Sequence, residues 1–181
     1  MSRLFVDASA FIALAEIGRE AQLLGLDGAV VVPRAVAAEI QDDPAASALD
    51  AAAQAEALRI VDGDEAGATG EANERLERAA AHLGYGAVDD GWSGDVALLA
   101  FGLGADDAVV VTDDGPLRRA CTALGVTVSG SIGVLVAAVR RGDLAPAEAK
   151  DALVAMDATG ARLSASLLRR AERLIDDAAR E

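Results

Sequence analysis

The chain has little of what secreted, zinc-dependent or membrane-spanning proteins require. Its 181 residues include one cysteine, Cys121, and one histidine, His82. An intrachain disulfide and a zinc site rich in cysteine or histidine are therefore excluded. No apolar run reaches the roughly 18 residues of a membrane-spanning helix, and the first residues lack the apolar stretch of a secretory signal. These absences predict a cytoplasmic protein with no membrane partner.

Aromatic residues are also scarce, at 3% of the chain, although hydrophobic residues make up 52%. The core must therefore consist mainly of alanine, valine, leucine and isoleucine. A chain of this length is large enough to bury a sizeable core as one unit. We expect a single domain over residues 1–181, with an α/β core in 1–142 and a C-terminal helical extension in 143–181.

Positive charge is scarce as well, and Lys150 is the only lysine in a chain of net charge −14. Such a charge ordinarily argues against a nucleic-acid partner. An acidic surface poor in lysine also suits concentrated salt, where the Debye length falls to about 3 Å at 1 M and repulsion of phosphates becomes short-ranged. The composition is typical of a halophilic protein, or of a genome rich in GC.

Apolar runs and helical patterns alternate along the chain. Strands are predicted at 4–6, 29–32, 58–61, 108–112 and 126–128, and helices at 9–16, 33–41, 44–57, 94–103, 116–124, 131–141, 146–156 and 164–179. This alternation is typical of right-handed βαβ units. It predicts a three-layer α/β/α sandwich with a mostly parallel central sheet, followed by C-terminal helices.

The segment of about 63–94 interrupts this alternation and contains one predicted helix, 71–83. Its length is unusual for a connection between a strand and a helix. We interpret it as an insertion. It is either a lid or substrate-facing arm beside the sheet, or a surface excursion without a role.

Acidic residues occur at four places that such a sheet brings together. Asp7 and the Asp113–Asp114 pair follow predicted strands, while Glu39 and Asp95 lie in helical patterns. The carboxyl ends of parallel strands line one crevice, and clustered carboxylates repel one another unless a cation lies among them. Mg²⁺ and Mn²⁺ prefer carboxylate and water oxygens, and such ions promote in-line phosphoryl displacement. The pattern favours a divalent metal site.

Each acid taken alone has an ordinary structural explanation. Asp7 is a candidate helix cap, Glu39 a solvated helix residue, and Asp95 a first-turn acid favoured by the helix dipole. Asp113 and Asp114 fit a turn followed by an N-cap. The metal-site hypothesis therefore depends on the joint arrangement.

The same residues, in the same order, resemble the successive motifs of PIN domains. The motifs are Asp7-Ala8-Ser9-Ala10-Phe11-Ile12, the stretch from Pro33 to Glu39-Ile40, Asp95-Val96-Ala97-Leu98-Leu99-Ala100 and Thr112-Asp113-Asp114. The resemblance implies an α/β/α sandwich and, in active members, a ribonuclease dependent on Mg²⁺ or Mn²⁺. It implies that Asp7, Glu39, Asp95 and Asp114 bind metal. Asp113 would be a further ligand or a supporting group, and Ser9 would help to orient a metal-bound water.

Two PIN subgroups compete. The stretch from Ser129 to Leu135, with Arg140-Arg141-Gly142-Asp143-Leu144 and the terminal helices, is similar to an uncharacterised prokaryotic group related to VapC-type toxins. That resemblance implies an antitoxin partner. The motifs at Asp7, Asp95 and Asp113 also resemble archaeal ribosome-maturation endonucleases, but those normally carry a zinc ribbon, which this chain cannot build.

Other interpretations remain open beside these. A phosphatase or receiver domain also places aspartates at strand ends, but each ordinarily uses a lysine near the site, and Lys150 follows the predicted sheet. A PIN fold with poor activity, acting as a protein-binding module, is the non-enzymatic alternative.

Arginines and apolar helix residues supply the remaining expectations. Arg34 and Arg118 are candidates for contacts with RNA phosphates, with surface ion pairs as the alternative. Apolar residues in 153–168 predict either a homodimer or packing of the C-terminal helices onto the sheet.

Overall fold

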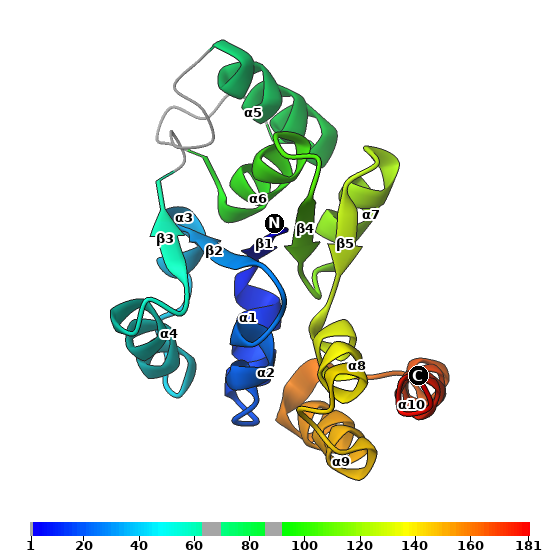
Figure 1. The fold of residues 1–181 in the computed structure, drawn as a ribbon. Coiled ribbons are helices and arrows are strands. Elements are labelled where there is room, and N and C mark those ends of the chain that lie inside the picture. Colours follow the sequence, from blue (N-terminus) through cyan, green and yellow to red (C-terminus); the bar gives the residue numbers. More distant parts are fainter. Residues whose placement is uncertain (1, 63–69, 86–91) are drawn as a thin grey trace.

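The centre of the molecule is a parallel sheet. In the computed structural model, which describes residues 2–62, 70–85 and 92–181, five strands form one sheet in the order β3–β2–β1–β4–β5 (Figure 1). They are β1 (Arg3–Val6), β2 (Ala29–Pro33), β3 (Arg59–Val61), β4 (Ala108–Val111) and β5 (Thr127–Ser129). All four pairings are parallel, and Phe5 on β1 lies in register with Val31 on β2 and Val110 on β4.

The order of the strands reverses beside β1. The chain runs outward from β1 through β2 to β3, and then crosses back to the other side of β1 to form β4 and β5. Connections on the two sides therefore leave β1 and β4 in opposite directions, which opens a crevice at the carboxyl ends of these strands. Asp7 directly follows β1 and Thr112 directly follows β4.

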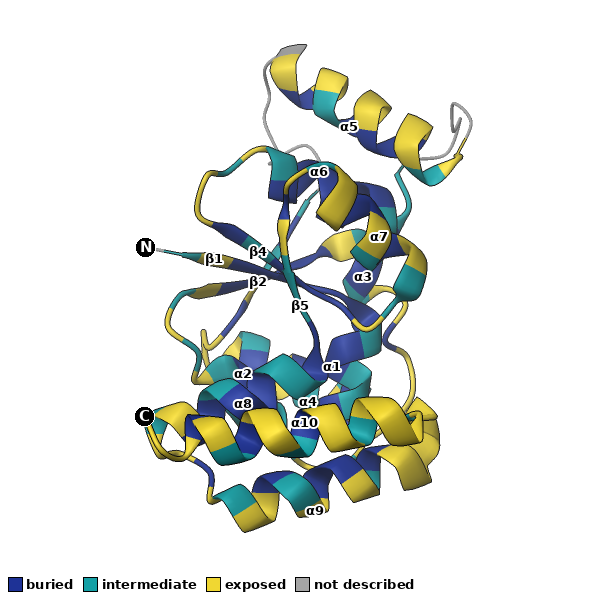
Figure 2. Cartoon of the chain, turned by 90° about the vertical axis from the view of Figure 1, so that its right-hand side faces the viewer, coloured by how far each residue is buried: buried dark blue, intermediate teal, exposed yellow. Residues whose placement is uncertain are grey.

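Helices cover both faces of the sheet (Figure 2). One face carries α3 (Arg34–Ala37), α6 (Gly94–Leu103) and α7 (Gly115–Ala123), with α5 (Gly70–Leu83) outside α6. The other carries α1 (Ala8–Ala15), α2 (Glu20–Leu24), α4 (Ala45–Gln54) and α8 (Ser131–Arg141), with α9 (Pro146–Met156), the π-helical turn η2 (Asp157–Ala161) and α10 (Ala165–Ala178) beyond them. The predicted α/β sandwich with a parallel sheet is confirmed.

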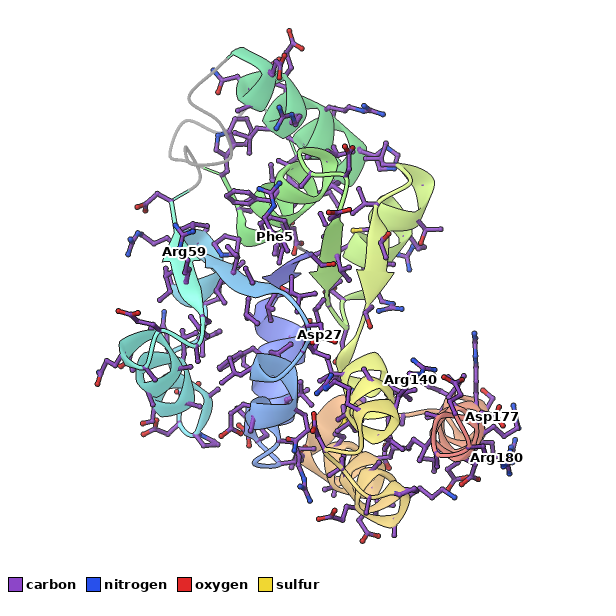
Figure 3. All side chains as sticks on the ribbon, in the orientation of Figure 1. Phe5, Asp27, Arg59, Arg140, Asp177 and Arg180 are labelled. Carbon is purple, nitrogen blue, oxygen red and sulfur yellow. The ribbon has the colours of Figure 1, made fainter. Side chains whose placement is uncertain are left out.

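Composition explains why the strands and α6 lie at the centre. The runs Val30–Val32 and Val109–Val111 supply β-branched side chains to strands covered on both faces. Residues Val96 to Gly102 of α6 are all buried, because the helix lies between the sheet and α5. Phe101 of α6 stacks on Phe5 of β1 with ring centroids 5.1 Å apart; Figure 3 labels Phe5 beneath α6.

In the part of the insertion that the structure describes, the chain packs against the rest of the protein and does not extend from it as an arm. Helix α5 packs on α6, and Ala72, Leu76, Ala79 and Ala80 are buried there. The residues 63–69 and 86–91 of the predicted insertion lie outside the described part. Helix α5 therefore forms an outer layer that completes the burial of α6.

Two further elements differ from the sequence prediction. The helix expected over 33–41 is only one turn, α3, because the chain continues in tight turns that place Ile40 in the core. Glu39 therefore lies beyond a helix instead of within one. The short helix α2 was not predicted, since it has five residues and buries only Leu23.

In the described part of the chain, none of the helices combines the length and the apolar character needed to cross a membrane.

Candidate functional site

Asp7 lies at the centre of the crevice between β1 and β4. It is the N-cap residue of α1, is 5% exposed, and its backbone N–H donates to the carbonyl of Val111 at 2.9 Å. Its Oδ2 accepts hydrogen bonds from the hydroxyls of Ser9 and Thr112, the latter at 2.6 Å. A buried carboxylate is costly unless hydrogen-bonded, and these two hydroxyls fix its orientation.

The chain after β4 is built around the same two hydroxyls. The backbone N–H of Asp113 donates to Ser9 Oγ at 3.0 Å, and that of Asp114 donates to Thr112 Oγ1 at 3.0 Å. Thr112 is fully buried. The hydroxyls of Ser9 and Thr112 thus join the carboxyl ends of β1 and β4 into one unit.

Asp114 is the N-cap of α7. Its Oδ1 accepts from the backbone N–H of Leu117 at 2.7 Å, the usual bond of a capping aspartate. The capping role expected for Asp114 is confirmed. Its position at the edge of the crevice is set by this cap.

The carboxylate of Asp113 forms hydrogen bonds with the start of α8. Its carboxylate accepts from the backbone N–H of Ser131 at 2.9 Å and from the Ser131 hydroxyl at 2.6 Å. A Cβ on Gly130 would lie 2.5 Å from Asp113 Oδ1, so glycine is required for this close approach. Asp113 therefore ties the end of β4 to the start of α8.

Glu39 reaches the crevice from the chain after α3. A Cβ on Gly94 would lie 2.6 Å from Glu39 Oε1 and 2.9 Å from Val36 Cγ2. The Glu39 carboxylate therefore lies against the backbone at the start of α6. A larger residue at position 94 would require the side chains of Glu39 and Val36 to shift.

Asp95 lies next to that point, in the first turn of α6. Ser93 caps the helix by accepting from the Val96 N–H at 3.4 Å. The Tyr85 hydroxyl donates to Asp95 Oδ2 at 3.5 Å. Asp7, Asp95 and Asp114 thus all stand at helix N-termini, where the partial positive charge of the helix dipole favours an anion.

The four acids interact electrostatically. Partial burial raises the pKa of Glu39 above its ordinary value, and the negative charges of Asp7 and Asp95 raise it further. Burial likewise raises the pKa of Asp95, as do the charges of Asp7 and Asp114, while the Tyr85 hydroxyl acts in the opposite direction. The charges of acids from four separate segments therefore oppose the ionisation of Glu39 and Asp95.

This donor set fits a hard divalent cation in its chemistry. Carboxylate oxygens are the ligands that Mg²⁺ and Mn²⁺ prefer, and a cation among them would relieve the repulsion that raises both pKa values. Within the ranges 2–62, 70–85 and 92–181, however, no three acidic, histidine or cysteine side chains are already gathered as the ligands of one ion. The acids share a crevice without forming a closed coordination sphere.

The two arginines predicted to contact phosphate have other partners. Arg34 forms a two-pronged ion pair with Asp62, with Nη2 3.2 Å from Asp62 Oδ2. Arg118 Nη1 donates to the carbonyls of Thr112 at 2.8 Å and Ser129 at 2.5 Å. Arg118 therefore holds the ends of β4 and β5 together, and contact of either arginine with RNA stays a prediction.

The motifs did not predict the hydrogen bonds that the side chains of Thr112, Ser131 and Tyr85 make to the acids. Thr112 directly follows a strand and precedes two acids, so its hydroxyl was a detectable signal. Ser131 and Tyr85 carry no such signal, because only the fold brings them to Asp113 and Asp95. Cys121 is fully buried, and mainly this burial raises its pKa to about 11.

The fold and the site together define a class: an α/β protein with a parallel sheet whose strand order reverses at a crevice lined by acids. A family model described as PIN domain matches residues 3–177. The chain therefore belongs to the PIN-domain family, as its motifs predicted. PIN domains are generally nucleases and usually use divalent metal ions. Comparison with curated proteins gave no match.

Proposed function

We propose that this protein is an endoribonuclease that hydrolyses RNA phosphodiester bonds with Mg²⁺ or Mn²⁺. The observation that carries the proposal is the gathering of Asp7, Glu39, Asp95 and Asp114 in a PIN fold, where burial and the charges of neighbouring acids raise the pKa of Glu39 and of Asp95. Four carboxylates held together against their repulsion are an arrangement that a divalent cation stabilises.

In this proposal Asp7, Glu39, Asp95 and Asp114 hold the cation. When bound, such an ion lowers the pKa of a water and neutralises charge on the phosphate oxygens. Asp7 is the most firmly oriented of the four, since two hydroxyls fix its Oδ2. Ser9 orients Asp7 by donating its hydroxyl proton to Oδ2, and its oxygen retains one lone pair that can accept a hydrogen bond from water. Asp113 acts indirectly, by fixing the loop that carries Asp114.

The test is cleavage of a labelled RNA by Asp95→Asn and Asp7→Asn. Each substitution removes one negative charge from the cation site, and we expect cleavage to fall by roughly 100-fold or more, as when one transition-state contact is removed. Asp106→Asn is the matched control, because exposed Asp106 lies before β4, at the opposite end of the sheet. Circular dichroism verifies that each variant is folded.

Unchanged cleavage in both variants, or equal loss in the Asp106 control, would refute the assignment. Calorimetric titration with Mn²⁺ separates the non-enzymatic alternative. A wild type that binds Mn²⁺ without cleaving RNA would favour a protein-binding module, whereas weaker binding by Asp7→Asn together with lost cleavage supports the nuclease.

The biological setting is a separate part of the proposal. A toxin held inactive by an antitoxin protein, and an enzyme that processes ribosomal RNA, both use the chemistry proposed for these acids. Expression of the wild type beside Asp95→Asn distinguishes them: growth arrest by the wild type alone favours the toxin. Unimpaired growth favours RNA processing.

A further inference from the structure

A groove opens directly beside the acidic crevice, on the side of β5. It has a volume of about 610 Å³ and lies between the turn joining β5 to α8 and the outer helix α10. Ser9 and Asp113 line the groove, and Ser9 donates a hydrogen bond to Asp7, so the groove adjoins the site that contains Asp7. Its volume is typical of a pocket for a small molecule or a nucleotide.

The opposite wall is apolar and is open to solvent. It is formed by Leu163, Leu167 and Leu174, together with the buried Met156. Leu167 is 40% exposed and Leu174 is 43% exposed, whereas Ala171, which lies between them on the same face of α10 and also lines the groove, is buried. These leucines form an apolar surface at the groove, and a flat nucleic-acid base can pack on such a surface.

The stretch 162–173, which supplies part of this wall, is locally basic, unlike the molecule as a whole. Residues 162–173 contain the arginines Arg162, Arg169, Arg170 and Arg173 and a single acid, Glu172, in a chain of net charge −14. Arg170 lines the groove and forms no ion pair with any residue that the structure describes. Two other basic residues near α10 are ion-paired, Lys150 with Asp176 and Arg180 with Asp177.

We propose that this groove binds an unpaired nucleotide of the RNA next to the phosphodiester that is cleaved. The base lies against Leu163, Leu167 and Leu174, and the Arg170 guanidinium contacts the adjoining phosphate, which its geometry suits. Apolar contact with a base and a cation on the backbone are the usual elements of single-strand binding. An RNA strand accounts for the continuity with the acids, which a separate protein partner would not require. The inference rests on the proposed function.

The chain offers two matched pairs of variants for the test. Arg170→Glu changes the groove, while Arg173→Glu makes the same charge change one turn along α10, outside it. Leu167→Asp changes the apolar wall, while Val154→Asp places the same charge at a residue of α9 that is 62% exposed and does not line the groove. All four side chains are exposed, so the variants should fold.

Cleavage kinetics with a single-stranded oligoribonucleotide give the first measurement. We expect Arg170→Glu and Leu167→Asp to raise KM by about 10-fold or more with kcat nearly unchanged, because a binding contact away from the reacting atoms is lost. Arg173→Glu and Val154→Asp should stay within about twofold of the wild type. Equal effects of Arg170→Glu and Arg173→Glu would overturn the groove assignment while leaving the nuclease assignment intact.

Binding of the same fluorescent oligonucleotide in the Asp95→Asn background gives a measurement that does not depend on cleavage. Loss of binding by Arg170→Glu supports the groove even if the wild type proves inactive, in which case only the proposed function fails. A wild-type dimer that Leu174→Glu dissociates without any effect on RNA binding would instead assign the groove to a second copy of the chain.

Discussion

At the scale of single residues, Asp95 and Glu39 show the cost of assembling the acids. Both have a raised pKa in the folded protein, so the folded state binds protons more readily than the unfolded state does. Their contribution to the free energy of unfolding is therefore most favourable below their ordinary pKa values and is lost as the pH rises through the raised values. Above that range the charged acids destabilise the fold.

Removing one of these charges should therefore stabilise the metal-free protein. We expect Asp95→Asn to raise Tm at pH 7 by about 2 °C, since 1 kcal/mol corresponds to about 2–4 °C in a chain of this size and solvent screens part of the repulsion. The gain should shrink as the pH is lowered towards 4. Scanning calorimetry in a chelating buffer measures both effects.

Addition of Mn²⁺ supplies the control. A ligand that binds only the folded state raises stability, and the gain grows with the logarithm of its affinity. Mn²⁺ should therefore raise the Tm of the wild type more than that of Asp95→Asn, and so narrow or reverse the difference between the two. A metal-free variant that is less stable than the wild type at pH 7 would contradict the repulsion inferred for Asp95.

At the scale of elements, the C-terminal helices show how one helix serves two surfaces. On α10, Ala171, Ile175 and Ala178 are buried, while Leu167 and Leu174 remain exposed at the groove. Leu153 and Met156 of α9 are likewise buried. Much of the apolar stripe that predicted self-association therefore packs within the chain. A homodimer stays a prediction, for which Leu167, Leu174 and Val154 are exposed apolar residues of the C-terminal helices. Figure 3 labels Asp177 on α10, Arg180 just after α10, and Arg140 on α8. The Nε of Arg140 lies 2.5 Å from Glu181 Oε2.

Two neighbouring residues of α10 test this division. Ile175→Ala should lower the free energy of unfolding by about 2–4 kcal/mol, because it leaves a cavity in a fully buried position. Leu174→Ala, at the adjacent exposed residue, should cost less than about 1 kcal/mol. Urea titration measures both. Similar costs would show that α10 does not pack as described.

At the scale of the whole molecule, the net charge of −14 opposes compaction. We expect Tm to rise as KCl is added, with most of the increase complete by about 1 M, where the Debye length has fallen from about 10 Å to about 3 Å. The halophilic origin inferred from composition agrees with this expectation but does not follow from it. A rise that continues unchanged into saturating salt would indicate a general salt effect on hydration and not the screening of acids.

Much of the fold was predictable because its signals are local. Val30–Val32 and Val109–Val111 have the composition of buried strands, and the alternation of strands and helices indicated a parallel sheet. The extent of the helix before Glu39 was not predictable, since burial of Ile40 ends it early. The helix α5 was predicted, but its packing on α6 was not, because long-range contacts leave no local pattern.

For the site, the identity and order of Asp7, Glu39, Asp95 and Asp114 came from the motifs, and Asp114 as a helix cap came from its neighbours. The different hydrogen-bond partners of Asp113 and Asp114 could not be predicted in this way, because both residues are aspartates in the same turn. Only the structure shows that Asp113 accepts two hydrogen bonds from Ser131 while Asp114 faces the crevice beside Asp7 and Asp95.

The sequence by itself determined the class of fold, the family and the four acids, since each is written in short stretches of neighbouring residues. Tertiary structure alone decided that Thr112 and Ser9 share the carboxylate of Asp7, that Arg118 binds backbone carbonyls, and that α10 forms a basic, apolar wall beside the acids. The reason is physical: the interactions of a side chain depend on the residues that folding brings beside it, and these come from distant parts of the chain.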